Sequence, residues 1–266
     1  MISVDCNAGS LRTRVIGLAA AFAGASAASA NNLTVSDPFI VVNASSALGN
    51  GSVVIPLNSP DVTVYSDPSV DYAIWGTTQP VPIYNNSNQI VAVLISMNVT
   101  AARNTIGGVE RWGVDVDFNV QAGAADTSIQ LISPVVGFSP LTGASASTSA
   151  TLGGTDQDGN GLTITPSLTG GVGYQALING ASVFQSYFSS ILTAGAGLST
   201  GVAGNMTPSG AFVPIGGSVS SAQSIFGFTV SANDAAAGTS TFAVIPEPGV
   251  VTTLALGGML AARRRR

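Results

Sequence analysis

The 266 residues include 8 basic and 13 acidic side chains, one cysteine and no histidine, and every basic residue is an arginine. The chain therefore has no residues for a Ser-His-Asp triad, a histidine metal ligand, a P-loop lysine or a Schiff-base amine, and we expect a protein that is not an enzyme. From Asn31 to Ile245 eleven carboxylates stand against two arginines, a formal charge of −9, which argues against nucleic acid or anionic lipid as a partner.

The first thirty residues are typical of a cleaved signal peptide. Arg12 and Arg14 precede a short apolar run (residues 15–23), and small residues then lead to an A-x-A cleavage site formed by Ala28 and Ala30. Because the apolar run is too short to span a bilayer, we expect export followed by cleavage after Ala30. The single cysteine lies within this segment, so the mature chain would have no thiol.

The segment from Asn31 to Ile245 has the length of one domain and the composition of a β-rich protein. Charged residues make up only 8% of the chain and hydrophobic residues 45%, and much of the remainder is Gly, Ser, Thr and Asn. Abundant β-branched residues with little charge favour sheets over solvated helices. We predict a single, mainly β domain over residues 31–245, with a β-sandwich or jelly-roll-like fold.

Alternation of apolar and polar residues identifies the strands. The clearest case is the segment 111–120, whose predicted core row is Trp112, Val114, Val116, Phe118 and Val120. A second core row is predicted at Val91, Val93, Ile95, Met97 and Val99. Shorter strands are predicted at residues 39–42, 52–57, 62–65, 72–75 and 129–136.

One segment departs from this period of two. Apolar residues recur at steps of three and four from Tyr174 to Leu192, so we predict one amphipathic helix near residues 174–193, packed on the sheet. Gly180 lies inside this segment and weakens an unbroken helix by about 1 kcal/mol. Further along, the β-rich runs 225–230 and 239–244 flank a polar turn and are predicted as a final hairpin-like pair.

The stretch DQDGNG, which begins at Asp156, matches the first half of a calcium-binding loop. Alternate side-chain oxygens converge on the cation in such a loop, so the candidate ligands are Asp156, Asp158 and Asn160. The second half of the loop does not match, because Ser167 occupies the twelfth position, where a bidentate Glu is needed. A polar hairpin turn is the alternative interpretation, and the residues alone favour it.

Three carboxylates have a spacing compatible with a glycosidase. Glu110 adjoins a strand that carries Asp115 and Asp117, and residues two apart on a strand have Cα atoms about 6.5 Å apart on one face. An acid role needs an apolar environment that raises the pKa of one carboxyl, whereas these share their face with Arg111 and Asn119. A solvated strand face is therefore the favoured interpretation.

Three consecutive features mark the C-terminal residues: Pro246-Glu247-Pro248, an apolar stretch at 249–262, and the cluster Arg263, Arg264, Arg265 and Arg266. The positive-inside rule would hold the arginines on the cytoplasmic side and leave Pro-Glu-Pro outside. The two prolines would keep that peptide extended and reachable. A helix of these 14 apolar residues is roughly 21 Å long, short of a bilayer core of about 30 Å, so a thin bilayer or snorkelling arginines would have to accommodate it.

These three parts, in this order, closely resemble the PEP-CTERM sorting signal, which is also known as the ice-binding-protein C-terminal motif. The resemblance covers residues 245–266. It implies secretion, temporary retention in the inner membrane, recognition of Pro-Glu-Pro by an exosortase, and release or transfer to the cell surface or exopolysaccharide matrix. A tail anchor that is never processed has the same topology and is the alternative. Ice binding itself is not predicted, because the sequence lacks Thr-x-Thr ladders over stacked repeats.

We therefore expect an exported, non-enzymatic protein with a structural or adhesive role at the cell surface or in the extracellular matrix. The expected partners are extracellular polysaccharide and, transiently, an exosortase and the inner membrane. No cofactor is expected beyond calcium at the turn that begins with Asp156. Two alternatives stay open: a calcium-dependent carbohydrate-binding module, and a polysaccharide hydrolase based on Asp and Glu.

Overall fold

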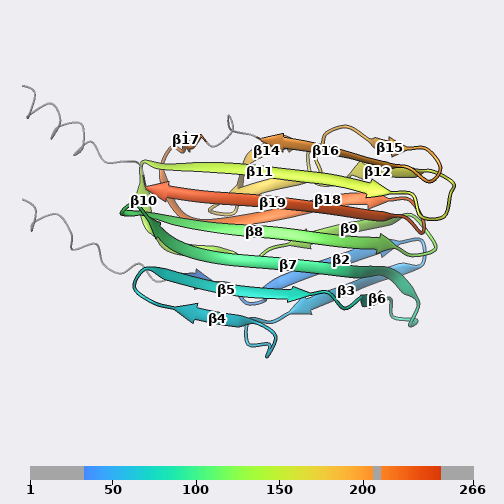
Figure 1. Ribbon diagram of the computed structural model, residues 1–266, viewed down its shortest axis with the longest axis horizontal. Coiled ribbons are helices and arrows are strands. Elements are labelled where there is room, and N and C mark those ends of the chain that lie inside the picture. Colours follow the sequence, from blue (N-terminus) through green and yellow to red (C-terminus); the bar gives the residue numbers. More distant parts are fainter. Residues whose placement is uncertain (1–32, 206–210, 247–266) are drawn as a thin grey trace, which may run out of the picture. The chain divides into compact units, whose positions relative to one another are not determined.

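The computed structural model describes residues 33–205 and 211–246, which form two antiparallel β-sheets lying face to face (Figure 1). Sheet A has ten strands and sheet B has nine. Within these two ranges the chain forms no helix, so none there is long and apolar enough to cross a membrane. The predicted β-sandwich is confirmed, while the predicted signal peptide and the apolar segment 249–262 lie outside the described residues.

Sheet A follows the order β1-β10-β18-β9-β2-β3, and the remaining strands extend it beside β18. Its strands are β1 (Thr34–Val35), β2 (Ile40–Ser46), β3 (Gly49–Ile55), β9 (Thr127–Ile132), β10 (Val136–Thr142), β12 (Leu162–Pro166), β13 (Tyr174–Ile178), β14 (Ala181–Tyr187), β15 (Leu192–Ala194) and β18 (Ser218–Val230).

Sheet B follows the order β16-β11-β19-β8-β7-β5-β4, with β17 beside β11 and β6 beside β7. Its strands are β4 (Thr63–Ser66), β5 (Val70–Thr77), β6 (Val81–Tyr84), β7 (Ile90–Ile106), β8 (Val109–Ala122), β11 (Ala144–Thr155), β16 (Ser199–Asn205), β17 (Val213–Pro214) and β19 (Ala235–Pro246).

Strand β8 has the alternation that the sequence predicted. The five predicted core side chains are at most 4% exposed: Trp112, Val114, Val116, Phe118 and Val120. The residues between them are half-buried or exposed. One face of this central strand therefore belongs to the core and the other to the outer surface of sheet B.

The companion row on β7 is interrupted by a β-bulge. The register with β8 shifts between Leu94 and Ser96, so Ile95 is an extra residue. Leu94 is fully buried, whereas Val93 and Ile95 are only half-buried, and the buried positions resume at Met97. The prediction that Val93 and Ile95 lie in the core row is therefore wrong, because the inserted residue reverses the phase of the strand.

The predicted helix near residues 174–193 is also wrong, because its first part forms the hairpin β13–β14. Ile178 pairs with Ala181, and the two-residue loop Asn179-Gly180 has φ angles of 51° and 75°. Two consecutive positive φ angles are typical of a type I′ turn, for which Asn-Gly is a preferred sequence. Strand β13 also pairs with β18, so burial against sheet A outweighs the helical spacing of the apolar residues.

The predicted final hairpin is replaced by a crossing between the sheets. Strand β18 belongs to sheet A and β19 to sheet B, and residues 231–234 connect them. At this crossing the Asp234 carbonyl accepts the Ala122 N–H at 2.8 Å. Strand β19 then lies between β11 and β8, so the last described strand is central to sheet B.

Aromatic side chains join the two sheets across the core. Phe118 of β8 packs edge-on against Phe226 of β18, with ring centroids 4.9 Å apart, and Tyr174 lies 4.8 Å from Phe226. The Tyr174 hydroxyl is within hydrogen-bonding distance, 3.0 Å, of both Thr148 in sheet B and Ser224 in sheet A. Because this hydroxyl is paired, the tyrosine fills the core without a buried polar group left unsatisfied.

Arg103 of β7 holds a buried ion-pair cluster at one end of sheet B. Its Nε donates to Asp71 at 2.6 Å and its Nη1 to Glu110 at 3.2 Å, and its side chain is 3% exposed. Burial opposes the ionisation of Asp71, but hydrogen bonds from Ser66 and Arg103 outweigh this, so the pKa of Asp71 lies below its ordinary value. One of the two arginines of the body thus has a structural role.

We predict that Arg103→Ala destabilises the fold by about 3 kcal/mol, because it leaves the Asp71 carboxylate buried without its cation. Urea unfolding followed by tryptophan fluorescence measures the loss. Arg111→Ala is the matched control: among the described residues Arg111 forms no salt bridge, and its guanidinium lies 6.0 Å from the centroid of the Phe212 ring. Equal losses in the two variants would contradict a special role for the buried cluster.

Candidate functional site

The predicted calcium turn meets a third carboxylate that the sequence analysis missed. Carboxylate oxygens of Asp156, Asp158 and Asp234 lie within 4.8 Å of one another. Asp234 comes from the crossing between β18 and β19, 76 positions beyond Asp158 in the sequence. The third predicted ligand, Asn160, instead donates its side-chain N–H to Asp158 at 2.8 Å. The residues that could hold a cation are therefore the three aspartates.

Hydrogen bonds from the protein already use the two buried carboxylates of this cluster. Asp156 accepts the N–H groups of Gly159, at 3.1 Å, and of Gly197. Asp234 accepts the Gln157 N–H at 3.0 Å and the Ser231 hydroxyl at 2.5 Å. The Gly197 bond contributes most to holding the pKa of Asp156 below its ordinary value. This arrangement favours the polar-turn interpretation, in which hydrogen bonds to the carboxylates connect the turn at Asp156, the loop at Gly197 and the crossing at Asp234.

We predict that Asp156→Ala lowers the melting temperature by a few degrees in EDTA, because the Gly159 and Gly197 N–H groups lose their acceptor without any metal being involved. Asp158→Ala is the matched control, because this aspartate is exposed and bonds chiefly to neighbouring amide side chains. Differential scanning fluorimetry with and without calcium provides the measurement. A rise in melting temperature with calcium that Asp158→Ala removes would contradict the turn interpretation.

Acid should weaken the fold only well below neutral pH. The N–H of Ser69, its hydroxyl and the Val70 N–H lower the pKa of Asp67 to about 2, and the pKa values of Asp71 and Asp156 are also lowered. A lowered pKa in the folded state gives stability that is present above the unfolded value of about 3.9 and is lost as pH falls through the folded value.

We therefore predict an unfolding free energy that is constant from pH 8 to about pH 5 and falls towards pH 2, as measured by urea titrations across this range. The absence of histidine removes the side chain that ordinarily titrates between these limits. A transition centred near pH 6 would be inconsistent with the assigned hydrogen bonds.

The three carboxylates considered for a glycosidase are not gathered in one cleft. Glu110 is paired with Arg103, and Asp115 and Asp117 lie on the exposed face of β8. Asp117 lines a depression of about 430 Å³ that Asp115 does not line. Displacement of water by neighbouring groups raises the pKa of Asp115, while Thr241 and Arg111 oppose this shift. The solvated strand face is the interpretation that this geometry favours.

Of the predicted sorting residues, the structure describes only Pro246. It is the last residue of β19 and pairs with Ala144 of β11. Glu247, Pro248 and the four arginines lie outside the described residues, as do Ala28 and Ala30. The Pro-Glu-Pro peptide therefore begins at the last residue paired in a central strand.

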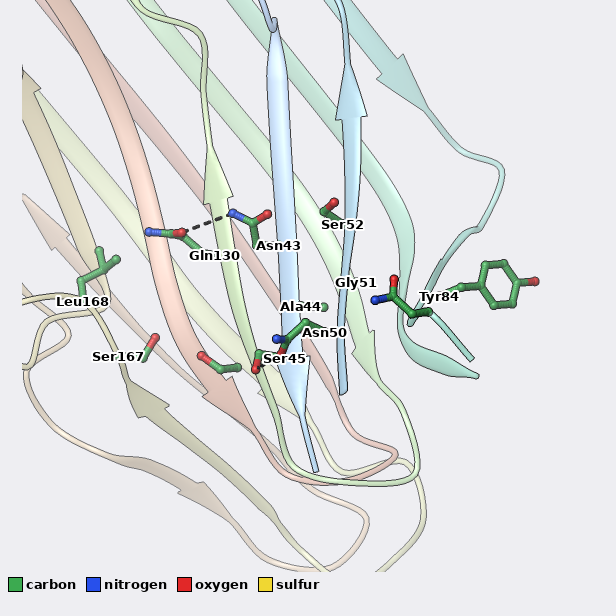
Figure 2. A pocket seen from close by; sticks show the side chains of 12 residues that line it. Asn43, Ala44, Ser45, Asn50, Gly51, Ser52, Tyr84, Gln130, Ser167 and Leu168 are labelled. Atoms are coloured by element: carbon green, nitrogen blue, oxygen red, sulfur yellow. Dashed lines mark hydrogen bonds between the residues drawn. The ribbon is translucent and has the colours of Figure 1, made fainter. Parts of the chain in front are cut away.

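A groove of about 800 Å³ on the outer face of sheet A was missed by the sequence analysis (Figure 2). Its floor includes outward side chains of three adjacent strands: Asn43 on β2, Asn50 on β3 and Gln130 on β9. Asn43 Nδ2 donates to Gln130 Oε1 at 3.4 Å, and the Ser45 hydroxyl donates to Asn50 Oδ1 at 2.6 Å. The only sequence signal is the alternation of amides and hydroxyls on each strand, which is also typical of any solvated sheet face.

Two glycines allow segments that flank this groove to lie close to sheet A. Gly51 forms an isolated bridge with Asn85, and a Cβ at Gly51 would collide with the Tyr84 carbonyl oxygen. On the opposite side, a Cβ at Gly227 would collide with the side chain of Leu168. The backbone at Tyr84 can lie this close to β3 only because Gly51 has no side chain, and Gly227 leaves room for the Leu168 side chain. The two glycines therefore help to shape the flanks of the groove.

No family model matches the chain, and no curated protein matches it. Among solved structures, the chain is similar to one of infectious bursal disease virus, Gx strain, with 10% identity over 83% of this chain and 71% of that chain and a TM-score of 0.31. A structure of the Gt strain gives 9% identity, coverage of 81% and 75%, and a TM-score of 0.25. Similarity at this level supports no conclusion about function.

Proposed function

We propose that this is an exported protein sorted through a PEP-CTERM tail by an exosortase to the cell surface or exopolysaccharide matrix, where it has a non-enzymatic, structural or adhesive role. The observation that carries the proposal is the tail: Pro246-Glu247-Pro248, an apolar stretch and four arginines. A membrane anchor alone would not need the Pro-Glu-Pro peptide. The signal-like first thirty residues supply the export that such sorting requires.

The position of the tail on the body supports this proposal. Strand β19 is hydrogen-bonded on both sides, to β11 and to β8, and ends at Pro246. Because the strand is central, the folded body would stay intact when residues after Pro246 are removed. Cleavage near Pro-Glu-Pro would then release a complete sandwich from the membrane.

The chemistry of the body supports a non-enzymatic role. The chain has neither histidine nor lysine, and its acidic groups serve structure or lie on an open face. Glu110 and Asp71 neutralise Arg103, while Asp156 and Asp234 fasten turns. A sandwich with polar outer faces suits display or adhesion.

Intact-mass and terminal-peptide mass spectrometry tests the proposal on protein recovered separately from membranes and extracellular matrix of the native host. We expect a matrix form that starts at Asn31, ends near Pro-Glu-Pro and lacks the four arginines. Glu247→Ala should hold the protein in the membrane fraction with its arginines retained. Asp61→Ala, which changes an exposed carboxylate of the body, is the matched control.

Two outcomes would overturn the sorting proposal. One is a matrix form that retains the four arginines, because release would then not involve the tail. The other is a wild-type protein found only in membranes with its arginines intact, which would make the tail a permanent anchor.

A calcium-dependent carbohydrate-binding module is the second candidate, favoured by one observation: Asp234 joins the predicted turn at Asp156 and Asp158. This candidate requires that EDTA abolish glycan retention and that Asp158→Ala have the same effect. If neither EDTA nor Asp158→Ala changes glycan retention, the calcium-dependent candidate is rejected and the calcium-independent, adhesive role stands.

A further inference from the structure

We propose that the groove on the outer face of sheet A binds a neutral polysaccharide chain. The groove spans β9, β2 and β3, beside β18, and about 800 Å³ is available in it (Figure 2). Neighbouring strands lie roughly 4.8 Å apart, so the distance from β18 to β3 is roughly 14 Å. A site of this length suits several linked sugars in an extended chain better than a single sugar.

The neutral character of the ligand follows from the lining. Twelve residues line the groove, and none of them has a charged side chain. The body as a whole carries a formal charge of −9, which disfavours an anionic polymer such as a uronate or a nucleic acid. Without a local cation to offset that charge, selectivity must come from hydrogen bonds.

The polar groups in the groove match sugar hydroxyls. A hydroxyl both donates and accepts, and so does a carboxamide, whose NH₂ and carbonyl point in different directions. Two hydrogen bonds orient the groove amides: one joins Asn43 to Gln130, and the other joins Ser45 to Asn50. Each amide uses only one donor or acceptor in these bonds. The Gln130 NH₂, the Asn43 carbonyl and the Asn50 NH₂ make no other assigned hydrogen bond within the described part of the chain, so they are free to meet a ligand.

The two ends of the groove add apolar surface to this polar floor. Leu168 and Ser167 stand on the β18 side, and Tyr84 stands on the β3 side with 49% of its surface exposed (Figure 2). A pyranose presents apolar C–H groups on its ring faces and hydroxyls at its edge. An exposed tyrosine where the groove opens can pack against such a face as the sugar chain leaves the floor.

Affinity electrophoresis of the full chain in mild detergent tests this inference, with dextran, galactomannan and hydroxyethylcellulose as neutral probes and alginate as the anionic probe. We expect at least one neutral polymer to retard the protein, and alginate to leave it unretarded. Gln130→Ala and Asn50→Ala should each weaken retention roughly 3- to 10-fold, the effect of losing one or two hydrogen bonds. Ser52→Trp should abolish retention by filling the groove.

Asn98→Ala is the matched control, because it removes an exposed amide from the outer face of sheet B. Unchanged thermal unfolding establishes that each variant is folded. The inference is overturned if no neutral polymer retards the protein, if alginate alone does, or if Asn98→Ala weakens retention as much as Gln130→Ala.

Glycan binding by the groove does not depend on the proposed sorting function. Only the identification of the host matrix as the source of the glycan rests on that proposal. Retention in the gel does not involve the tail, and the terminal mass spectrum does not involve the groove. Failure of one experiment therefore leaves the other intact.

Discussion

Phe118 packs the middle of sheet B against the middle of sheet A. Its ring on β8 contacts Phe226 and Phe228 on β18, with centroid separations of 4.9 and 5.7 Å. Both strands have hydrogen-bonded neighbours on each side, so this contact ties the middle of sheet B to the middle of sheet A. Since successive side chains on a strand face opposite ways, the alternation that buries Phe118 also places Asp117 and Asn119 on the outer surface.

Short polar side chains give the outer faces their character. With 8% of its residues charged, the chain exposes hydroxyls and amides where many proteins expose lysine and glutamate. Some of the few charged groups have structural tasks, as Arg103 has in its buried cluster and Asp156 in its turn, whereas Asp115 and Asp117 lie on the exposed face of β8. On sheet A this leaves a groove lined without charged side chains, beside which Gly51 and Gly227 allow flanking segments to lie close.

The errors in the sequence analysis occur where local spacing and long-range pairing disagree. The strand at β8 was predicted correctly because one uninterrupted period of two covers it. On β7 the extra residue Ile95 reverses the phase, which no count of apolar positions reveals. In β13 and β14 the apolar residues have helical spacing, but Asn179-Gly180 closes a turn and β18 offers a partner, so sheet pairing prevails.

By itself the sequence determined the β-rich character of the body, its acidity, its lack of histidine and lysine, and the inward face of its clearest strand. These properties are local, because composition and side-chain alternation can be counted along the chain. Only the tertiary structure decided that Asp234 joins Asp156, and that Asn43, Asn50 and Gln130 share one groove. Those neighbours depend on which distant strands pair and where the chain crosses between sheets, and that is fixed by burial of the whole core.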